Sequence, residues 1–301
     1  MKKFTSILTL IIAIVALISV QSCKGPSSSG RVLKFNLEKG KTYDYEIIWN
    51  MDQQMMGQDS KIDITGGYSF DVTDDNNHVK TLKAEYKAFK MYMKMMGVEI
   101  DIDTEKPAAP LSEEEIKANP LGMISRMFAG IKGKEFIMKV DEEGKVLEVS
   151  GFEKIVNEMV DSVNVSDDVK MQMRASLQDQ FNEQSIKDQF APVFTIFPNK
   201  EVKIGDSWEK SWQTGGRTPA KYNTKYTVKS IEGDQVSLSA QTSISSNNDE
   251  MKTKGIQKGN LLVDSKTGLV INTEFEQDID TEGRGMKVKT IGKGKIKGRE
   301  R

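Results

Sequence analysis

The feature that most constrains the fold of this chain is an alternation of apolar and polar residues over two long stretches. In the clearest case, Phe89, Met91, Met93 and Met95 occupy every second position of residues 89–95. Successive side chains of a β-strand point to opposite faces, so a period of two predicts a strand with one buried face. The same pattern predicts strands over 43–51, 61–72 and 78–88.

The second stretch, residues 201–301, has the same character. Turn-forming residues at 232–234, 246–249 and 264–268 separate its alternating segments, as those at 57–60 and 74–77 do in the first stretch. Polar turns of this kind join neighbouring antiparallel strands, so each stretch is predicted to fold as an antiparallel meander. The predicted strands of the second stretch are 207–213, 222–231, 235–245, 251–263, 269–280 and 286–296.

Residues 106–200 are predicted to be mainly helical, with one hairpin over 135–140 and 145–149. Ser112 and Glu115 have the spacing of a capping box, which predicts a helix start. Further helices are predicted over 123–131, 152–161 and 167–190. In the last helix, an apolar stripe at every fourth residue predicts a face that packs against the sheet. This stripe consists of Val169, Met173, Leu177 and Phe181.

Together these patterns predict an α+β fold. It consists of a large curved antiparallel β-sheet, similar to a half-barrel, with the helical segment packed on it. We expect a single domain over 32–301, in which one β-meander over 32–105 and another over 201–301 flank the mainly helical insert over 106–200.

The first residues have the three parts of an export signal. Lys2 and Lys3 supply positive charge, residues 7–20 form an apolar run, and residues 20–23 resemble the lipobox of bacterial lipoproteins. The apolar run is shorter than the roughly 20 residues that a membrane-spanning helix needs. The resemblance implies that residues 1–22 are removed and that Cys23, the only cysteine of the chain, is lipidated.

Residues 23–31 are predicted to form a flexible tether, because serine and glycine are frequent there. Lipidation of Cys23 makes a membrane the first expected partner, since two or three acyl chains hold a soluble domain on a bilayer. Lys24 occupies the position at which lipoproteins retained in the inner membrane typically carry aspartate. The resemblance therefore implies a cell-envelope location on the outer membrane, facing the periplasm.

Composition argues against several classes of function. The 43 basic and 44 acidic residues nearly cancel and are interspersed, so we expect no binding to nucleic acid. One histidine and one cysteine are too few for zinc sites built from these residues, for internal disulfides and for most catalytic triads. The chain also has no glycine-rich phosphate loop and no nucleophile elbow. We therefore expect no enzyme activity, no cofactor and no metal.

Methionines gather in two neighbouring predicted strands, at positions 51, 55, 56, 91, 93, 95 and 96. One interpretation is a Cu(I) site, since thioethers bind this ion and the strand ends could bring several sulfurs together. A second is that the methionines fill the core, and a third is that they form a soft wall for an apolar ligand. Trp208 and Trp212 share one face of their predicted strand and add apolar area. The candidate apolar-ligand face is Phe89, Met91, Met93, Met95, Trp208 and Trp212.

Two polar patterns also have a functional and a structural interpretation. Glu99, Asp101 and Asp103 lie on one face of a predicted strand, where three carboxylates could hold Ca²⁺. Alternation of carboxylates with isoleucine is equally typical of a strand that shows one face to water. His78 follows a predicted turn, where an exposed imidazole is expected. We interpret both patterns as surface features.

Residues 202–208 read Val-Lys-Ile-Gly-Asp-Ser-Trp and follow a proline at position 198. This stretch, the hairpin at 140–146 and the turn at 264–270 resemble fixed points in a family of Bacteroidota lipoproteins of unknown activity. The architecture is similar to the lipoprotein-carrier class, whose curved half-barrel and helical lid enclose an apolar cavity. These resemblances imply a non-enzymatic envelope lipoprotein that binds an apolar or lipid-like ligand between sheet and helices. The alternative is a structural or interaction module that recruits another envelope protein through a sheet edge or a surface patch.

Overall fold

The computed structural model of the chain describes residues 30–95, 97–106, 127–180, 182–215, 219–247, 251–283 and 285–301. Within these residues, twelve strands form one antiparallel sheet, and β1 (Arg31–Leu33) and β8 (Lys200–Val202) form a separate two-stranded sheet. The strands of the large sheet are β2 (Thr42–Met55), β3 (Gln58–Asn76), β4 (Val79–Met95), β5 (Val98–Asp103), β6 (Glu135–Asp141), β7 (Val146–Ser150), β9 (Ser207–Gln213), β10 (Lys221–Glu232), β11 (Gln235–Asn247), β12 (Met251–Asp264), β13 (Val270–Gly283) and β14 (Met286–Glu300).

The strand order explains how two meanders become one sheet. One half of the sheet contains, in spatial order, β2, β3, β4, β6 and β7. The other half contains β14, β13, β12, β11, β10 and β9 in that order. The halves join where β2 pairs with β14, from Tyr43 opposite Glu300 to Met55 opposite Val288. The predicted α+β fold with a large antiparallel sheet is confirmed. Each strand predicted after residue 201 is present, with ends shifted by only a few residues.

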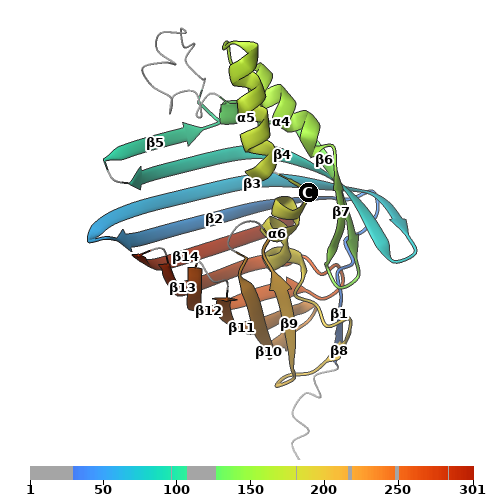
Figure 1. Cartoon of the computed structure of the whole chain (residues 1–301). Helices are drawn as coiled ribbons and strands as arrows, with labels where there is room; N and C mark the ends of the chain where they lie inside the picture. Colours follow the sequence, from blue (N-terminus) through green and yellow to red (C-terminus); the bar gives the residue numbers. More distant parts are fainter. Residues whose placement is uncertain are drawn as a thin grey trace, which may run out of the picture.

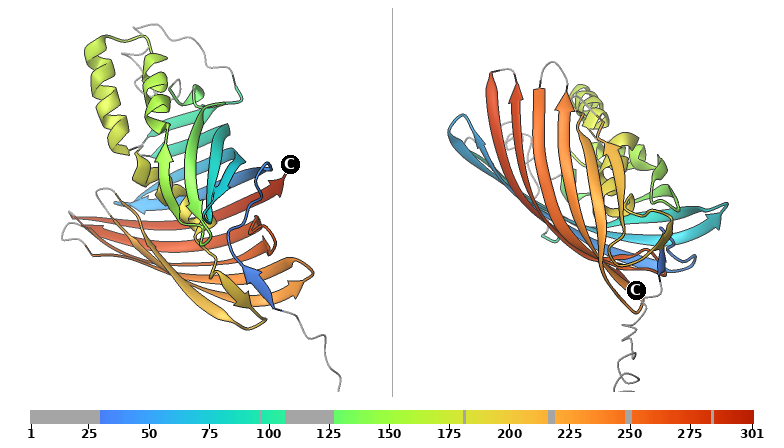
Figure 2. Two further views of the ribbon diagram at one scale, coloured as in Figure 1. Left: turned by 90° about the vertical axis from the view of Figure 1, so that its right-hand side faces the viewer. Right: turned by 90° about the horizontal axis from the view of Figure 1, so that it is seen from below.

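The sheet is strongly curved, and helix α6 (Glu183–Phe194) lies over its concave side (Figures 1 and 2). We call the concave side the inner face and the opposite side the outer face. Tyr45 and Phe70 point to the inner face and are buried. The outer face carries cross-strand ion pairs, such as Lys293 with Glu276 at 3.1 Å. The sheet therefore follows the usual arrangement of an antiparallel sheet with one packed and one solvated face.

A β-bulge in β4 aligns two alternations of opposite phase. Lys87 is the extra residue between Tyr86 and Ala88, which pair with consecutive residues of β3. A bulge of this kind shifts all later side chains by one position. The even-numbered core residues before Lys87 and the odd-numbered residues from Phe89 to Met95 therefore all point to the inner face. The strands predicted over 78–88 and 89–95 are a single strand, β4.

The core between α6 and the inner face is largely aromatic. Phe194 of α6 contacts Phe35, Tyr45 and Phe70, with ring centroids 5.1, 5.9 and 5.6 Å apart. Phe190, one turn earlier, contacts Phe70 at 5.5 Å and stacks on Phe194 at 5.7 Å. All five rings are almost completely buried. Buried aromatic pairs contribute large apolar area and favourable edge-to-face geometry, so this cluster holds α6 against the sheet.

The helical region differs in part from the sequence prediction. Helix α4 (Phe152–Asp161) has the predicted bounds. The prediction of one helix over 167–190 is wrong, because α5 (Asp167–Gln180) and α6 are separate helices. Asn182 begins α6 with a capping box, in which its side chain accepts a hydrogen bond from the Ser185 backbone and the Ser185 hydroxyl accepts one from the Asn182 backbone. This cap satisfies the first free amide groups of α6 and allows the chain to change direction there.

The apolar stripe of α5 does not lie on the sheet, and that prediction is wrong. α5 packs against α4, beside the end of the sheet formed by β4, β5 and β6 (Figure 1). Met173 and Leu177 of the stripe are partly buried, whereas Val169 is exposed. Phe181, its last member, lies outside the described residues.

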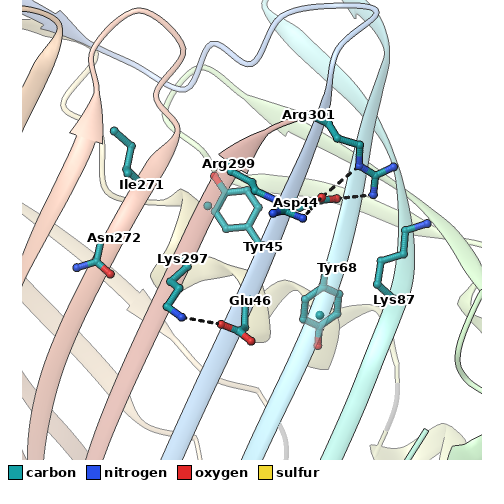
Figure 3. Close-up of a pocket in the computed structure, with 12 residues that line it drawn as sticks. Asp44, Tyr45, Glu46, Tyr68, Lys87, Ile271, Asn272, Lys297, Arg299 and Arg301 are labelled. Carbon is teal, nitrogen blue, oxygen red and sulfur yellow. Dashed lines mark hydrogen bonds and ion pairs between the residues drawn. The ribbon is translucent and has the colours of Figure 1, made fainter. Parts of the chain in front are cut away.

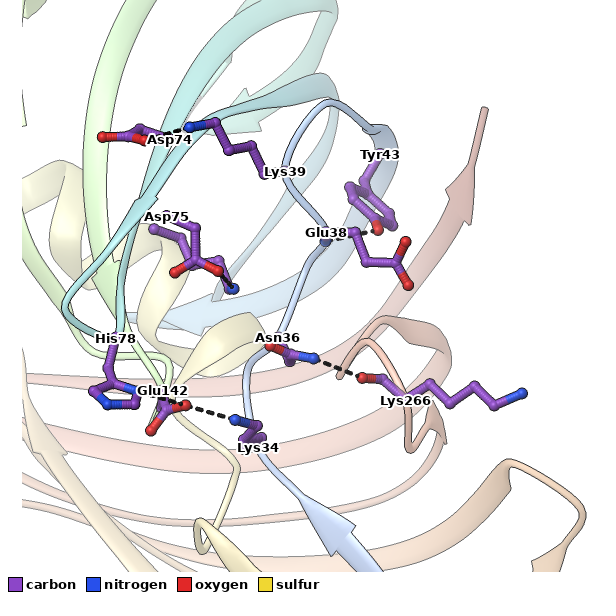
Figure 4. A network of polar contacts seen from close by, with 11 residues as sticks. Lys34, Asn36, Glu38, Lys39, Tyr43, Asp74, Asp75, His78, Glu142 and Lys266 are labelled. Carbon is purple, nitrogen blue, oxygen red and sulfur yellow. Dashed lines mark hydrogen bonds and ion pairs between the residues drawn. The ribbon is translucent and has the colours of Figure 1, made fainter.

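The segment that leads from β1 to β2 ties distant turns together (Figure 4). Lys34 forms an ion pair with Glu142 at 2.6 Å, and Nδ1 of His78 lies 3.1 Å from the same carboxylate. The side-chain amide of Asn36 donates to the backbone carbonyl of Lys266 at 3.1 Å. The His78 side chain is 80% exposed, which confirms its predicted place on the surface. The hydrogen bond from Lys34, supported by His78, holds the pKa of Glu142 below its usual value despite partial burial.

Some sequence predictions fall on residues outside the described ranges. These are the export signal over 1–22, the lipidated Cys23 with most of its tether, and the helix start at Ser112. Of the helix predicted over 123–131, the described part is helical at 127–129. Among the described residues, no helix is long and apolar enough to cross a membrane.

Candidate functional site

A cavity of about 340 Å³ lies between α6 and the inner face of strands β9 to β14 and β2. Its lining is mostly aromatic, aliphatic or uncharged polar. The lining residues are Trp49, Asp188, Gln189, Pro192, Trp212, Thr214, Tyr222, Thr224, Tyr226, Ala240, Thr242, Gln257, Gly259, Leu261, Thr273, Phe275 and Ile296.

The cavity floor combines small residues with one large ring. Gly259 of β12 and Gly294 of β14 are the cross-strand neighbours of Phe275 on β13. A Cβ atom at Gly259 would lie 2.7 Å from Cβ of Phe275, and one at Gly294 would overlap the phenyl ring. The ring therefore occupies the space above Gly294 that a side chain would fill. Trp49 packs edge-on against Phe275, with centroids 4.7 Å apart.

One wall of the cavity is a pair of stacked aromatic rings at the edge of the sheet. Trp212 of β9 and Tyr222 of β10 are register partners, and their parallel rings are 3.9 Å apart. Burial, and in second place the negative charge of Asp188, raises the pKa of the Tyr222 hydroxyl. Tyr222 therefore stays protonated at neutral pH and presents a neutral surface to the cavity.

The roof is the face of α6 that carries Asp188, Gln189 and Pro192. One oxygen of Asp188 accepts a hydrogen bond from the backbone amide of Gly215 at 2.6 Å, and the other accepts one from the Gln184 side chain at 2.7 Å. The amide of Gln189 donates to the hydroxyl of Tyr68. These bonds fasten the roof to the end of β9 on one side and to β3 on the other.

Uncharged polar groups lie among the apolar residues of the floor. Thr224 and Thr242 are less than a tenth exposed, and their hydroxyl groups share a hydrogen bond of 2.9 Å. Thr273 is buried to the same degree, and its hydroxyl oxygen has no partner in the described part of the chain. A buried hydroxyl without a partner costs about 1–3 kcal/mol. The floor therefore combines apolar area with uncharged polar side chains.

The six residues of the candidate apolar-ligand face all lie on the inner face, but only Trp212 lines this cavity. Trp208 is a core residue, 8% exposed, whose indole nitrogen donates to the backbone carbonyl of Ile196 at 2.8 Å. Phe89 lies on β4, many strands away from Trp212 on β9, and its ring stacks on that of Phe128 with centroids 5.2 Å apart. The sheet does not bring the methionine strand and the tryptophan strand together, because β2, β3 and β10 to β14 lie between them.

Sequence reasoning missed most of the cavity lining. Tyr222, Thr224 and Tyr226 alternate along β10 and face inward, so the period of two contains the signal that they share a face. Phe275 likewise alternates with Glu274 and Glu276 along β13, whereas Asp188 carried no such signal. Their role depends on where α6 crosses the sheet, and this crossing depends on contacts between residues far apart in the chain.

A second hollow, of about 760 Å³, is lined mainly by charged side chains of β2 and β14 (Figure 3). Asp44 accepts from Arg301 at 2.8 Å and from Arg299 at 3.3 Å, and Lys297 pairs with Glu46 at 3.2 Å. Partial burial opposes ionisation of Asp44, but the two arginines outweigh it and lower the pKa of this carboxyl. Both carboxylates of the described lining are paired with basic side chains, and we assign no ligand to this hollow.

Within the described residues, no group of three or more His, Cys, Asp or Glu side chains is placed to hold a metal ion. On the predicted acidic strand face, Asp103 lies 3.6 Å from Lys90 and 3.7 Å from Lys106. These carboxylates therefore face ammonium groups. Met96, one of the sulfurs of the Cu(I) interpretation, lies outside the described residues.

The fold and the cavity define a class of protein: an α+β chain whose open antiparallel sheet encloses an apolar space beneath a helix. The chain belongs to the family of unknown function DUF6263, whose sequence pattern matches residues 77–270. This agrees with the resemblance to a family without assigned activity. No curated protein matches the chain at a significant level.

Solved structures with a similar course of the chain share little sequence with it. One is lipovitellin, from a study of its lipid–protein interactions, with 8% identity and a TM-score of 0.47 over 88% of this chain. This chain spans only 25% of the lipovitellin chain. Another is the translocator domain of the autotransporter NalP from Neisseria meningitidis, with 6% identity, a TM-score of 0.35 and 97% of both chains covered. The function proposed below rests on the cavity itself.

Proposed function

We propose that this protein binds an apolar or lipid-like ligand, without chemical conversion, in the cavity between α6 and the inner face of the sheet. The observation that carries the proposal is the cavity itself, with its aromatic and aliphatic lining. Its volume of about 340 Å³ lies in the range of roughly 300–1,000 Å³ that is usual for small-molecule sites. Roughly eleven water molecules of about 30 Å³ each would fill the same space.

The apolar lining supports a ligand of the same character. Water against Trp49, Tyr226, Leu261 and Phe275 lacks most of its hydrogen-bond partners, so an apolar chain that replaces it gains free energy. The inner face continues beyond the cavity into the half-buried methionines of β4. Methionine side chains adapt to irregular shapes, which suits a ligand longer than the cavity.

The polar groups of the lining support binding rather than catalysis. Among the described lining residues, Asp188 is the one that carries a charge, and both of its oxygens already accept hydrogen bonds. General acid–base catalysis needs a titratable group within reach of a reacting atom and usually a second group beside it. Threonine hydroxyls without an adjacent base are poor nucleophiles. The site residues are therefore suited to hold a ligand.

We propose a place in the cell envelope for this function, with the chain anchored through lipidated Cys23 and facing the periplasm from the outer membrane. The support is the resemblance of residues 20–23 to a lipobox and the lysine at position 24. Replacing Cys23 with alanine is expected to release the protein from membranes into the soluble fraction. A Cys23→Ala protein that still sediments with membranes would contradict the anchor.

The second candidate function is a module that recruits another envelope protein. One observation favours it: among the described strands, β9 pairs only with β10 and forms an edge of the sheet. An edge strand has free backbone groups that could pair with a strand from another protein. The edge is short and carries Glu209 and Lys210, charges that discourage such pairing. The cavity is therefore the stronger basis for a function.

Native mass spectrometry of the full chain, purified from membranes, tests the proposed function directly. We expect the protein to carry a non-covalent adduct that organic extraction recovers as an apolar molecule. The adduct must be distinguished from the acyl chains on Cys23, which remain covalently attached after denaturation. A protein that is free of adduct after mild purification and takes up none from added lipid would contradict the proposal.

A further inference from the structure

The charge of the cavity lining bears on which head groups a ligand can carry. This inference rests on the proposed function. We propose that the cavity takes amphiphiles whose polar end is uncharged or cationic, and that Asp188 is the specificity-determining residue that rejects anionic ones. The distinction is between fatty alcohols or amines on one side and fatty acids or other anionic lipids on the other.

The first support is the charge of the described lining. None of the seventeen described lining residues is lysine, arginine or histidine. Lys210 lies on the inner-facing side of the neighbouring strand β9, but its ammonium group is 2.5 Å from the carboxylate of Glu143. An anionic head group that entered the cavity would lose its hydration without gaining a counter-charge from the lining, which is costly.

The second support is the position of Asp188. Its carboxylate lies between α6 and the end of β9, held there by the backbone amide of Gly215 and by the side chain of Gln184. Both of these donors are neutral. The negative charge of Asp188 therefore acts on whatever polar group a ligand places beside the Trp212–Tyr222 pair. An anionic group placed there is repelled by the Asp188 carboxylate, and the repulsion is stronger in a partly buried site than in water.

The third support is the nature of the floor. The polar groups there are uncharged: the hydrogen-bonded hydroxyls of Thr224 and Thr242, the carboxamide of Gln257, and the hydroxyl of Thr273, which has no partner in the described part of the chain. A hydroxyl or an amine of the ligand can pair with these groups. They add hydrogen bonds without adding charge, which fits a ligand that has no negative charge of its own.

Three ligands with the same chain test this selectivity: 1-decanol, decylamine and decanoate at pH 7.5. Their affinities for the full chain are measured by displacement of the neutral fluorophore N-phenyl-1-naphthylamine. We expect decanoate to bind roughly tenfold more weakly than 1-decanol, and decylamine to bind at least as tightly as 1-decanol. Decanoate that binds as tightly as 1-decanol would overturn the selectivity.

The variant Asp188→Asn is the matched control, because it removes the charge and keeps an acceptor for the Gly215 amide. It is expected to strengthen decanoate binding several-fold and to weaken decylamine binding, so that the affinities of the three ligands converge. Binding of 1-decanol to the variant shows that the cavity is still formed. If the variant shifts none of the three affinities, Asp188 does not set the selectivity. If no decyl compound binds either protein, the proposed function itself fails.

Discussion

Replacing Phe194 with alanine tests whether the aromatic cluster holds α6 against the sheet. The side chain is 1% exposed, and its ring contacts those of Phe35, Tyr45, Phe70 and Phe190. Removing a buried phenylalanine costs about 3–5 kcal/mol, from lost apolar burial and from the cavity that remains. With four ring contacts, Phe194 should not fall below the middle of that range, so we expect the free energy of unfolding to fall by about 4 kcal/mol.

The measurement is equilibrium unfolding in urea, with thermal unfolding as a second readout. A loss of about 4 kcal/mol corresponds to a fall in Tm of roughly 8–16 °C for a domain of this size. Met171→Ala on α5 is the control, because this side chain is 63% exposed and its removal is expected to change stability by less than about 0.5 kcal/mol.

The result that refutes the reasoning is a small effect. If Phe194→Ala lowers the free energy of unfolding by less than about 1.5 kcal/mol, either the surrounding side chains fill the space that the ring leaves or α6 does not pack against the sheet. A loose α6 would also remove the roof of the cavity. Binding of an apolar probe to this variant should therefore fall together with its stability.

Two further predictions concern the cavity floor and the segment before β2. Gly294→Ala should destabilise the fold by about 1–3 kcal/mol in urea unfolding, since the new Cβ overlaps the Phe275 ring, whereas Gly130→Ala, with no atom closer than 3.4 Å, should be nearly neutral. Glu142→Gln should cost stability at neutral pH. The folded-state pKa of Glu142 is lowered by Lys34, so its contribution is present above the usual value of 4.5 and is lost as the pH falls through the lowered pKa. Variant and wild type should therefore converge in acid, and a difference in stability that grows as the pH falls would contradict this.

Local alternation was sufficient to predict the strands of the sheet, but not the pairing that joins its two halves. The strands of residues 207–296 follow from a period of two and from clear turns, because both signals act within a few residues. The pairing of β2 with β14 joins residues about 250 positions apart, such as Asp44 and Arg299. No local pattern encodes such a partner, and it is set by the burial of both strands against the same core.

The limits of sequence reasoning in the helical region have a local cause. The apolar stripe of α5 correctly predicted that one face of this helix is packed. The pattern does not say whether that face packs against a sheet or against another helix. The break before α6 did have a signal, since Asn182 and Ser185 have the spacing of a capping box. The bulge at Lys87 also had a signal, because the apolar alternation changes there from even to odd positions, and the bulge decides that the methionines of β4 face inward.

Of the six residues predicted to form a ligand face, one lines the cavity. An apolar space between sheet and helices was expected, and Trp212 was among the expected residues. Asp188 comes from α6, whereas Thr273 and Phe275 come from β13, and α6 is held over this strand by the aromatic cluster and by the hydrogen bonds of Asp188 and Gln189. Their convergence depends on tertiary packing, which a period of two or of 3.6 does not describe.

The most direct test of the account compares apolar binding to wild type and to two variants of strand β11. Ala240 lines the cavity, whereas its neighbour Gln241 points to the outer face of the same strand. Ala240→Phe fills the cavity with a ring, and Gln241→Phe adds the same ring outside it. Titration with N-phenyl-1-naphthylamine is expected to show saturable binding to wild type and to Gln241→Phe, and at least tenfold weaker binding to Ala240→Phe. Equal binding to all three proteins would contradict the cavity as the site.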